Sequence, residues 1–126
     1  MLNRKEVHNS ETLNIQIDSH NQKSYLIELS KDCTKFDLNV ECLENSFSKF
    51  FILNHAESAC ELNINMVLKQ DANCQMGVLD LEKSPLKWNH YVDLKEQGAE
   101  YEILSGQLCQ EHIEKVCDME VRHNAP

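Results

Sequence analysis

Residues 57–78 read ESACELNINMVLKQDANCQMGV and alternate apolar with polar side chains in two runs. Apolar side chains occupy every second position from Cys60 to Leu68 and again from Cys74 to Val78. A period of two places the apolar residues on one face of an extended strand. The same alternation recurs in further stretches, at residues 13–17, 25–29, 36–42, 86–94 and 117–121. The sequence therefore predicts an all-β domain.

A repeat precedes these strands. The hexapeptide at residues 57–62, ESACEL, corresponds to DANCQM at residues 71–76, which starts 14 residues later. Shorter versions, a polar residue and small residues before a strand, occur at 32–36 and 97–101, so that the wider spacings are near 26 residues. Such spacing favours coils stacked on one another, a β-solenoid, over the alternative of a β-sandwich. The twelve asparagines, together with aspartates, are expected to take the left-handed backbone positions at its corners, because the chain has only 3 glycines.

Two stretches do not follow the alternation. Leu43, Phe47, Phe50 and Phe51 are spaced like one face of a helix. Residues 104–116 can also be placed on a helical face, through Leu108, His112 and Val116. In these two stretches the strand assignment competes with a helical one.

Length and charge limit the functional classes. The 126 residues suit a single domain, residues 1–126, and the net charge of -9 is concentrated in the second half. Because the basic residues are scattered, a nucleic acid or an anionic membrane is not an expected partner. No stretch approaches the roughly 20 apolar residues that span a bilayer, and the N-terminus lacks a signal-peptide pattern. We expect a cytoplasmic protein.

Six cysteines could form disulfides or hold a metal, but in a cytoplasmic chain reduced thiols are expected. Cys60 and Cys74 occupy equivalent places in the two repeats, which predicts that they stack between adjacent coils. The only local cluster of soft ligands is Cys109, His112 and Cys117, with His123 beyond it. In an extended chain Cys109 and His112 point to opposite faces, so structural cysteines are the competing interpretation.

No catalytic constellation is recognisable. A thiol enzyme would pair a cysteine with a histidine, and His55 near Cys60 or His112 near Cys109 are nominal pairs, but no glycine-rich elbow or oxyanion-type loop accompanies them. Paired acids such as Glu100 and Glu102 or Glu111 and Glu114 suit a solvated face. Trp88 and His90 alternate within one predicted strand and are expected to pack in the core or at a sheet edge rather than to stack on a base or a sugar. The sequence predicts a protein that is not an enzyme.

A longer order of residues resembles a known family. Gly98-Ala99-Glu100 is followed by an apolar-x-Gly-apolar step around Gly106, and then by a strand that ends in His123 with Pro126 shortly after. This order resembles the core of the SufB/SufD family of iron–sulfur cluster assembly proteins. The resemblance covers residues 50–126 and implies a right-handed parallel β-helix, here a fragment of one.

The resemblance also implies partners and a cofactor. Members act with a SufB/SufD-type partner chain and an ABC-type ATPase, so we expect a component of iron–sulfur assembly that acts as a scaffold or protein contact and holds a cluster at most transiently. Arg122 stands where the family often has Asp, and the part that carries the family's cluster ligands has no counterpart before Pro126. A shortened solenoid with unpaired strand edges predicts a homodimer or heterodimer. The alternative is an all-β protein-binding module unrelated to clusters, whose acidic second half meets a basic partner.

Overall fold

The fold consists of strands and short turns. The computed structural model describes residues 2–80, 86–107 and 115–123, and within these ranges every regular element is a strand. The ten strands are β1 (Leu2–Val7), β2 (Ser10–Ile17), β3 (Gln22–Leu29), β4 (Lys35–Cys42), β5 (Phe47–Asn54), β6 (Cys60–Leu68), β7 (Asn73–Asp80), β8 (Leu86–Leu94), β9 (Glu100–Gln107) and β10 (Lys115–His123). The predicted all-β class is confirmed.

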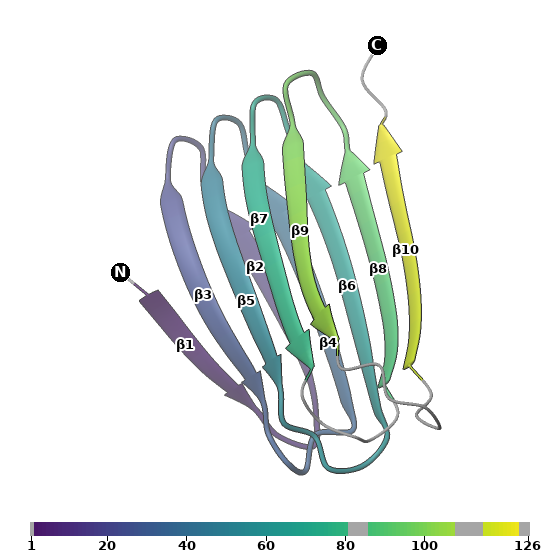
Figure 1. The fold of residues 1–126 in the computed structure, drawn as a ribbon. Helices are drawn as coiled ribbons and strands as arrows, with labels where there is room; N and C mark the ends of the chain where they lie inside the picture. The colour runs from purple at the N-terminus through teal and green to yellow at the C-terminus, as the bar shows by residue number, and fades with distance from the viewer. Residues whose placement is uncertain (1, 81–85, 108–114, 124–126) are drawn as a thin grey trace.

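The strands form two parallel five-stranded sheets that face each other (Figure 1). Sheet A has the order β1-β3-β5-β7-β9, and sheet B has the order β10-β8-β6-β4-β2. Successive strands therefore alternate between the sheets, and each coil of the chain adds one strand to each of them. All eight strand pairings are parallel. The expected β-solenoid is confirmed, and the sandwich alternative is wrong because antiparallel hairpins do not build these sheets.

The register fixes the length of a coil. Asn39 bonds Asn14 from 25 residues away, Asn63 bonds Asp37 from 26, and Asn73 bonds Glu100 from 27. The 14-residue repeat is thus about half a coil, which carries the chain from sheet B to sheet A. The predicted stacking of Cys60 on Cys74 is wrong for this reason. Cys60 in β6 lies opposite Leu86, whereas Cys74 in β7 lies opposite Ser48 and Tyr101.

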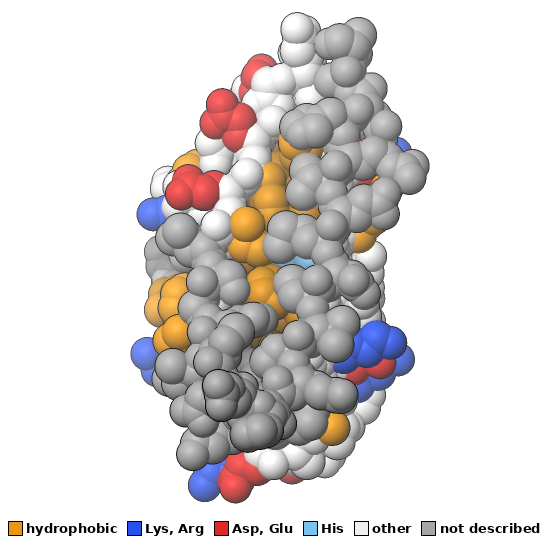
Figure 2. Space-filling model, turned by 45° about the vertical axis from the view of Figure 1, so that its right-hand side comes forward, with side chains coloured by type: hydrophobic (Ala, Val, Ile, Leu, Met, Phe, Trp, Pro, Cys, Tyr) orange, Lys and Arg blue, Asp and Glu red, His pale blue; other side chains and the backbone are white. Residues whose placement is uncertain are grey.

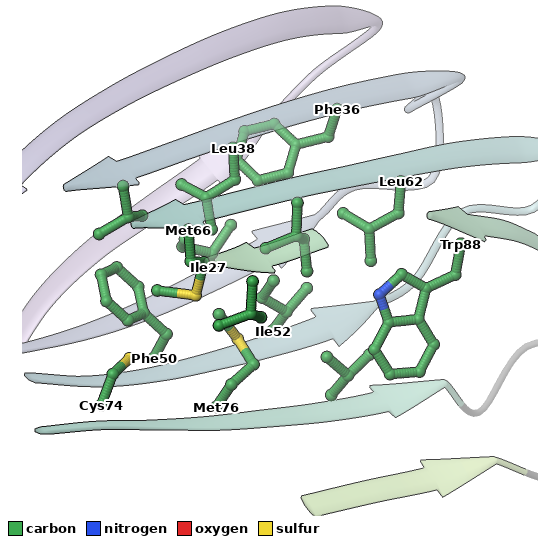
Figure 3. Close-up of a cluster of buried hydrophobic side chains, with 14 of the residues drawn as sticks. Ile27, Phe36, Leu38, Phe50, Ile52, Leu62, Met66, Cys74, Met76 and Trp88 are labelled. Carbon is green, nitrogen blue, oxygen red and sulfur yellow. The ribbon is translucent and has the colours of Figure 1, made fainter. Parts of the chain in front are cut away.

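The core lies between the sheets and is built from every second residue of each strand (Figure 3). In sheet B the column Phe36, Leu62 and Trp88 points inward, and in sheet A the register partners Phe50 and Met76 also point inward. Each fully buried side chain of this size contributes roughly 1.5–3 kcal/mol to folding. Figure 2 turns the β8 and β10 side forward and shows hydrophobic side chains gathered along the middle of that face.

Strand β5 replaces the helical face that the spacing of Leu43, Phe47, Phe50 and Phe51 suggested. Its inward residues are Ser48, Phe50, Ile52 and Asn54, so polar side chains at both ends conceal the alternation. Inside the protein, the Asn54 side-chain oxygen accepts a hydrogen bond from the backbone N–H of Ala56 at 3.0 Å. A buried amide with this partner is tolerated, and the pairing with β3 and β7 decides in favour of a strand.

The corners use left-handed residues that stack from coil to coil. Asn9, His20, Asn45 and Asp71 have φ between 53° and 62°, and Gly98 has φ 82°. His20, Asn45, Asp71 and Gly98 form one column. Within it, the backbone N–H of each of the first three donates to the carbonyl of the residue that precedes the next corner residue, at 3.0–3.2 Å. The expected use of Asn and Asp is confirmed at three corners, while His20 takes the fourth. At Gly98 a Cβ would overlap the carboxylate of Asp71, so no side chain fits there.

Candidate functional site

The ligands predicted from the sequence are not assembled by the described part of the chain. Cys109 and His112 lie outside the described residues. Cys117 lies in β10 opposite Trp88, and His123 lies in the same strand opposite Leu94. Among the residues that the structure describes, no group of three or more His, Cys, Asp or Glu is arranged to hold a metal ion. The proposed metal cluster therefore stays a prediction.

The clearest surface feature is an apolar groove on the outer face of sheet A. Its outward-facing residues are Leu2, Ser24, Lys49, Phe51, Gln75, Gly77 and Glu102, and the partly buried Tyr25 and the buried Phe50 and Met76 complete the lining; we call it the Phe51 groove. Its volume is about 310 Å³. Phe51 is 44% exposed and Leu2 is 51% exposed, and these are the two exposed large hydrophobic residues among the described residues.

The groove follows from the sequence of β5 and β7. Phe51 points outward because Phe50 and Ile52 occupy the inward positions of the same strand. Gly77 is its register partner in β7, and a Cβ at Gly77 would lie 2.7 Å from the Phe51 ring. The aromatic ring therefore lies directly over the glycine. The spacing of Phe51 suggested a helical face, so the groove was not predicted from the sequence. The available signal was Gly77, because a glycine within an alternating strand often marks a place where another group approaches the backbone closely.

The lining of the groove includes one basic and one acidic side chain. Lys49, Gln75 and Glu102 are register partners on β5, β7 and β9, so the base and the acid are separated by the width of two strand spacings, about 10 Å. The Lys49 ammonium lies 5.6 Å from the centroid of the Phe47 ring. An apolar groove whose lining includes both a base and an acid suits a peptide surface better than a single-charge ligand.

A polar cluster with two histidines lies where β1, β3 and β5 end. The cavity of about 390 Å³ is lined by Glu6, His8, Glu28, Ser30, Lys31, Asp32 and His55. The Ser30 hydroxyl and the Asp32 carboxylate both lie against Nδ1 of His8, at 3.1 and 3.2 Å, and Ser30 donates a short hydrogen bond to Asp32. A catalytic triad needs serine and aspartate on opposite ring nitrogens. This arrangement does not activate Ser30.

The outer face of sheet B carries ladders of amide side chains. Asn39 donates to Asn14 at 2.9 Å, and Asn65 donates to Asn39 at 3.1 Å. In a second ladder, Asn89 donates to Asn63 at 2.8 Å, and Asn63 donates to Asp37 at 2.7 Å. Most of the asparagines in these strands therefore join coils rather than turn corners, and the ladders fix the register between adjacent coils.

Trp88, His90 and Tyr101 form a buried polar cluster inside the solenoid. The His90 Nε2 and the Tyr101 hydroxyl are 2.5 Å apart, and the Trp88 and His90 ring centroids are 5.6 Å apart. Burial lowers the pKa of His90 to about 4, because desolvation penalises the charged imidazolium, and burial likewise raises the pKa of Tyr101. The interpretation of Trp88 and His90 as core residues is confirmed, with both side chains buried.

Four buried cysteines lie as two pairs, and neither pair is bonded. The sulfurs of Cys33 and Cys60 are 3.9 Å apart. Cys42, at the end of β4 in sheet B, contacts Cys74 of sheet A across the core. Its sulfur lies 3.6 Å from the hydroxyl of Ser48, which is also in sheet A. The reduced state expected for the six cysteines stays a prediction. His55, suggested from sequence as a partner of Cys60, has its Nε2 4.0 Å from Glu28.

Comparison of the chain with known protein families, with curated proteins and with solved structures finds no match. Within the described ranges, no helix has the length and the apolar character needed to cross a membrane.

Proposed function

We propose that this protein is a contact module, which binds another protein chain through the Phe51 groove. The observation that carries the proposal is the exposed Phe51 ring on the sheet face, 44% exposed and lying over Gly77 beside the exposed Leu2. Covering the exposed part of Phe51 alone contributes about 1 kcal/mol. Aromatic side chains in a recess with a polar rim are typical anchors of protein interfaces.

The more specific proposal is a role beside a SufB/SufD-type partner chain and an ABC-type ATPase in iron–sulfur cluster assembly. A parallel β-solenoid is the fold that the resemblance implies, and Gly98, one of the residues that carry it, stands at a corner with φ 82°. In this role the chain acts without chemistry of its own and holds a cluster at most transiently, with Cys109, His112 and Cys117 as candidate ligands. A homodimer or heterodimer is part of the same proposal.

Binding is tested by mixing the purified chain with a SufB/SufD-type partner and its ATPase and measuring complex formation by sedimentation. Phe51→Ser should weaken the complex about fivefold, because it removes the contribution of about 1 kcal/mol from the anchor of the groove. Glu41→Ala, at an exposed position on sheet B, serves as the matched control and should bind normally. Equal binding by both variants would contradict the groove as the contact surface.

The iron–sulfur role is tested separately from the contact role. Anaerobic reconstitution with iron and sulfide should give cluster that depends on Cys109 and Cys117, each replaced in turn by Ser. The alternative is a contact module unrelated to clusters. It would be supported if the chain takes up neither iron nor sulfide, does not bind the SufB/SufD-type partner, and still binds another protein through the groove.

A further inference from the structure

The pair Cys33 and Cys60 joins two neighbouring coils. Cys33 lies in the turn between β3 and β4, and Cys60 is the first residue of β6, 27 residues later. The Glu61 backbone N–H donates to the Thr34 carbonyl at 2.9 Å, which fixes this turn beside the start of β6. The two sulfurs are 3.9 Å apart, whereas a disulfide needs about 2.05 Å, so side-chain rotation with small backbone adjustment is the movement required.

Both sulfurs lie just beneath the surface. Cys60 is 4% exposed and Cys33 is fully buried. Their chain neighbours Ala59, Asp32 and Thr34 are all exposed. Cys60 is therefore the member of the pair that a small neutral oxidant in solvent meets first, and the sulfur of Cys33 lies 3.9 Å from its sulfur.

The second thiol pair provides an internal comparison. Cys42 and Cys74 are both fully buried, and Cys42 also contacts the Ser48 hydroxyl. Their contact crosses the core between the two sheets instead of lying in a turn. Reaching this pair requires opening of the core, which is rare in a stable domain.

We propose that Cys33 and Cys60 are an oxidisable thiol pair that a hydroperoxide converts to a disulfide linking two coils. The Cys60 thiolate attacks one peroxide oxygen, the O–O bond breaks, and Cys60 becomes a sulfenic acid while the first water forms. The Cys33 thiolate then attacks the Cys60 sulfur, the S–S bond forms and the S–O bond breaks. The hydroxide that leaves takes up a proton as the second water. Two thiols and one hydrogen peroxide thus give one disulfide and two waters.

This site is independent of the Phe51 groove. The groove residues lie on the outer face of sheet A, whereas Cys33 and Cys60 lie at the turn that leads into sheet B. A disulfide here closes a loop of one coil length and restricts the unfolded chain. The oxidised protein is therefore expected to resist unfolding better than the reduced protein.

The test treats the folded chain with hydrogen peroxide and follows its intact mass, free thiols and peptide map. The expected product has two fewer free thiols, a mass lower by about 2 Da, and a peptide link between Cys33 and Cys60. Its unfolding midpoint in urea should rise, and a thiol reductant should reverse the change. The variants Cys33→Ser and Cys60→Ser should each abolish the link, whereas Cys42→Ser should leave it intact.

Other products would overturn the proposal. A link from Cys60 to another cysteine, a link between Cys42 and Cys74 formed first, or oxygen added to Cys60 without any link would each show that this pair does not close. If both serine variants unfold, the peptide map of the oxidised parent chain still decides between these products.

Discussion

Burial of His90 makes the stability of the solenoid depend on pH. The pKa of His90 is lowered from 6.5 to about 4 by desolvation. In the unfolded chain the imidazole is hydrated and returns to its ordinary pKa, so between these two values the unfolded state binds a proton that the folded state excludes. The stability from this group is therefore fully present above the unfolded pKa and is lost as the pH falls through the window from 6.5 to about 4.

The size of the effect follows from the two pKa values. Each unit of difference corresponds to about 1.4 kcal/mol. The loss integrates to about 2 kcal/mol at about pH 5 and about 3 kcal/mol at about pH 4. For a domain of this size such a loss is a large fraction of the total free energy of unfolding.

Urea unfolding followed by fluorescence measures this directly, because Trp88 is the only tryptophan of the chain and lies in the same buried cluster. The variant His90→Gln keeps a nitrogen near the Tyr101 hydroxyl but does not titrate. Carboxylates titrate in both proteins, so the difference between their free energies of unfolding isolates His90. From about pH 7 to about pH 5 that difference should change by about 2 kcal/mol in favour of the variant.

His55→Gln is the matched control, because the side chain of His55 is 44% exposed. It should follow the pH dependence of the parent chain. If His90→Gln also follows the parent chain over the whole range, the assignment of the pH dependence to burial of His90 is wrong.

Three further changes test the corners, the groove and the ladders through the same urea midpoint. Gly98→Ala should lower the free energy of unfolding by about 1–3 kcal/mol, since Gly98 has a left-handed backbone and faces Asp71. Gln97→Ala is the control, and an equal loss in both variants would contradict the role assigned to the Gly98 corner. Gly77→Leu should cost about 1–3 kcal/mol because it displaces the Phe51 ring, and Gln75→Leu on the same strand face should cost less. Asn63→Leu should cost about 1–3 kcal/mol by leaving Asp37 and Asn89 without a shared partner in a partly buried ladder. Asn65→Leu, in the exposed ladder, should cost less, and a larger loss there would contradict the argument.

Sequence patterns were sufficient for the fold where strands follow the simple alternation. The runs at 60–68 and 73–80 and the spacing near 26 residues predicted strands stacked in coils, because identical half-coils need the same pattern of inward residues. Strand β5 was ambiguous, since Ser48 and Asn54 point inward and Phe51 points outward. Pairing with β3 and β7 determines which face of β5 is buried, and this pairing cannot be read from the spacing of residues within β5.

The surface features were harder to predict than the core. Nothing in the local sequence distinguishes the exposed Phe51 from the buried Phe50, because only the register with Gly77 determines which ring lies on the outer face. The Cys33 and Cys60 contact depends in the same way on a 27-residue separation that brings a turn beside the start of a strand. The short spacing of Cys109, His112 and Cys117 instead predicted these three residues as candidate metal ligands.

The stacking of coils on their neighbours has a consequence for how the chain folds. The described strand pairings join segments one coil apart, at separations of 25, 26 or 27 residues in the middle of the solenoid. Cooperativity therefore passes only between neighbouring coils, as along a one-dimensional chain of coupled units. Folding can start at any well-formed pair of coils and spread in both directions. Weakening a middle coil would uncouple the two ends, so that unfolding would lose its single sharp transition.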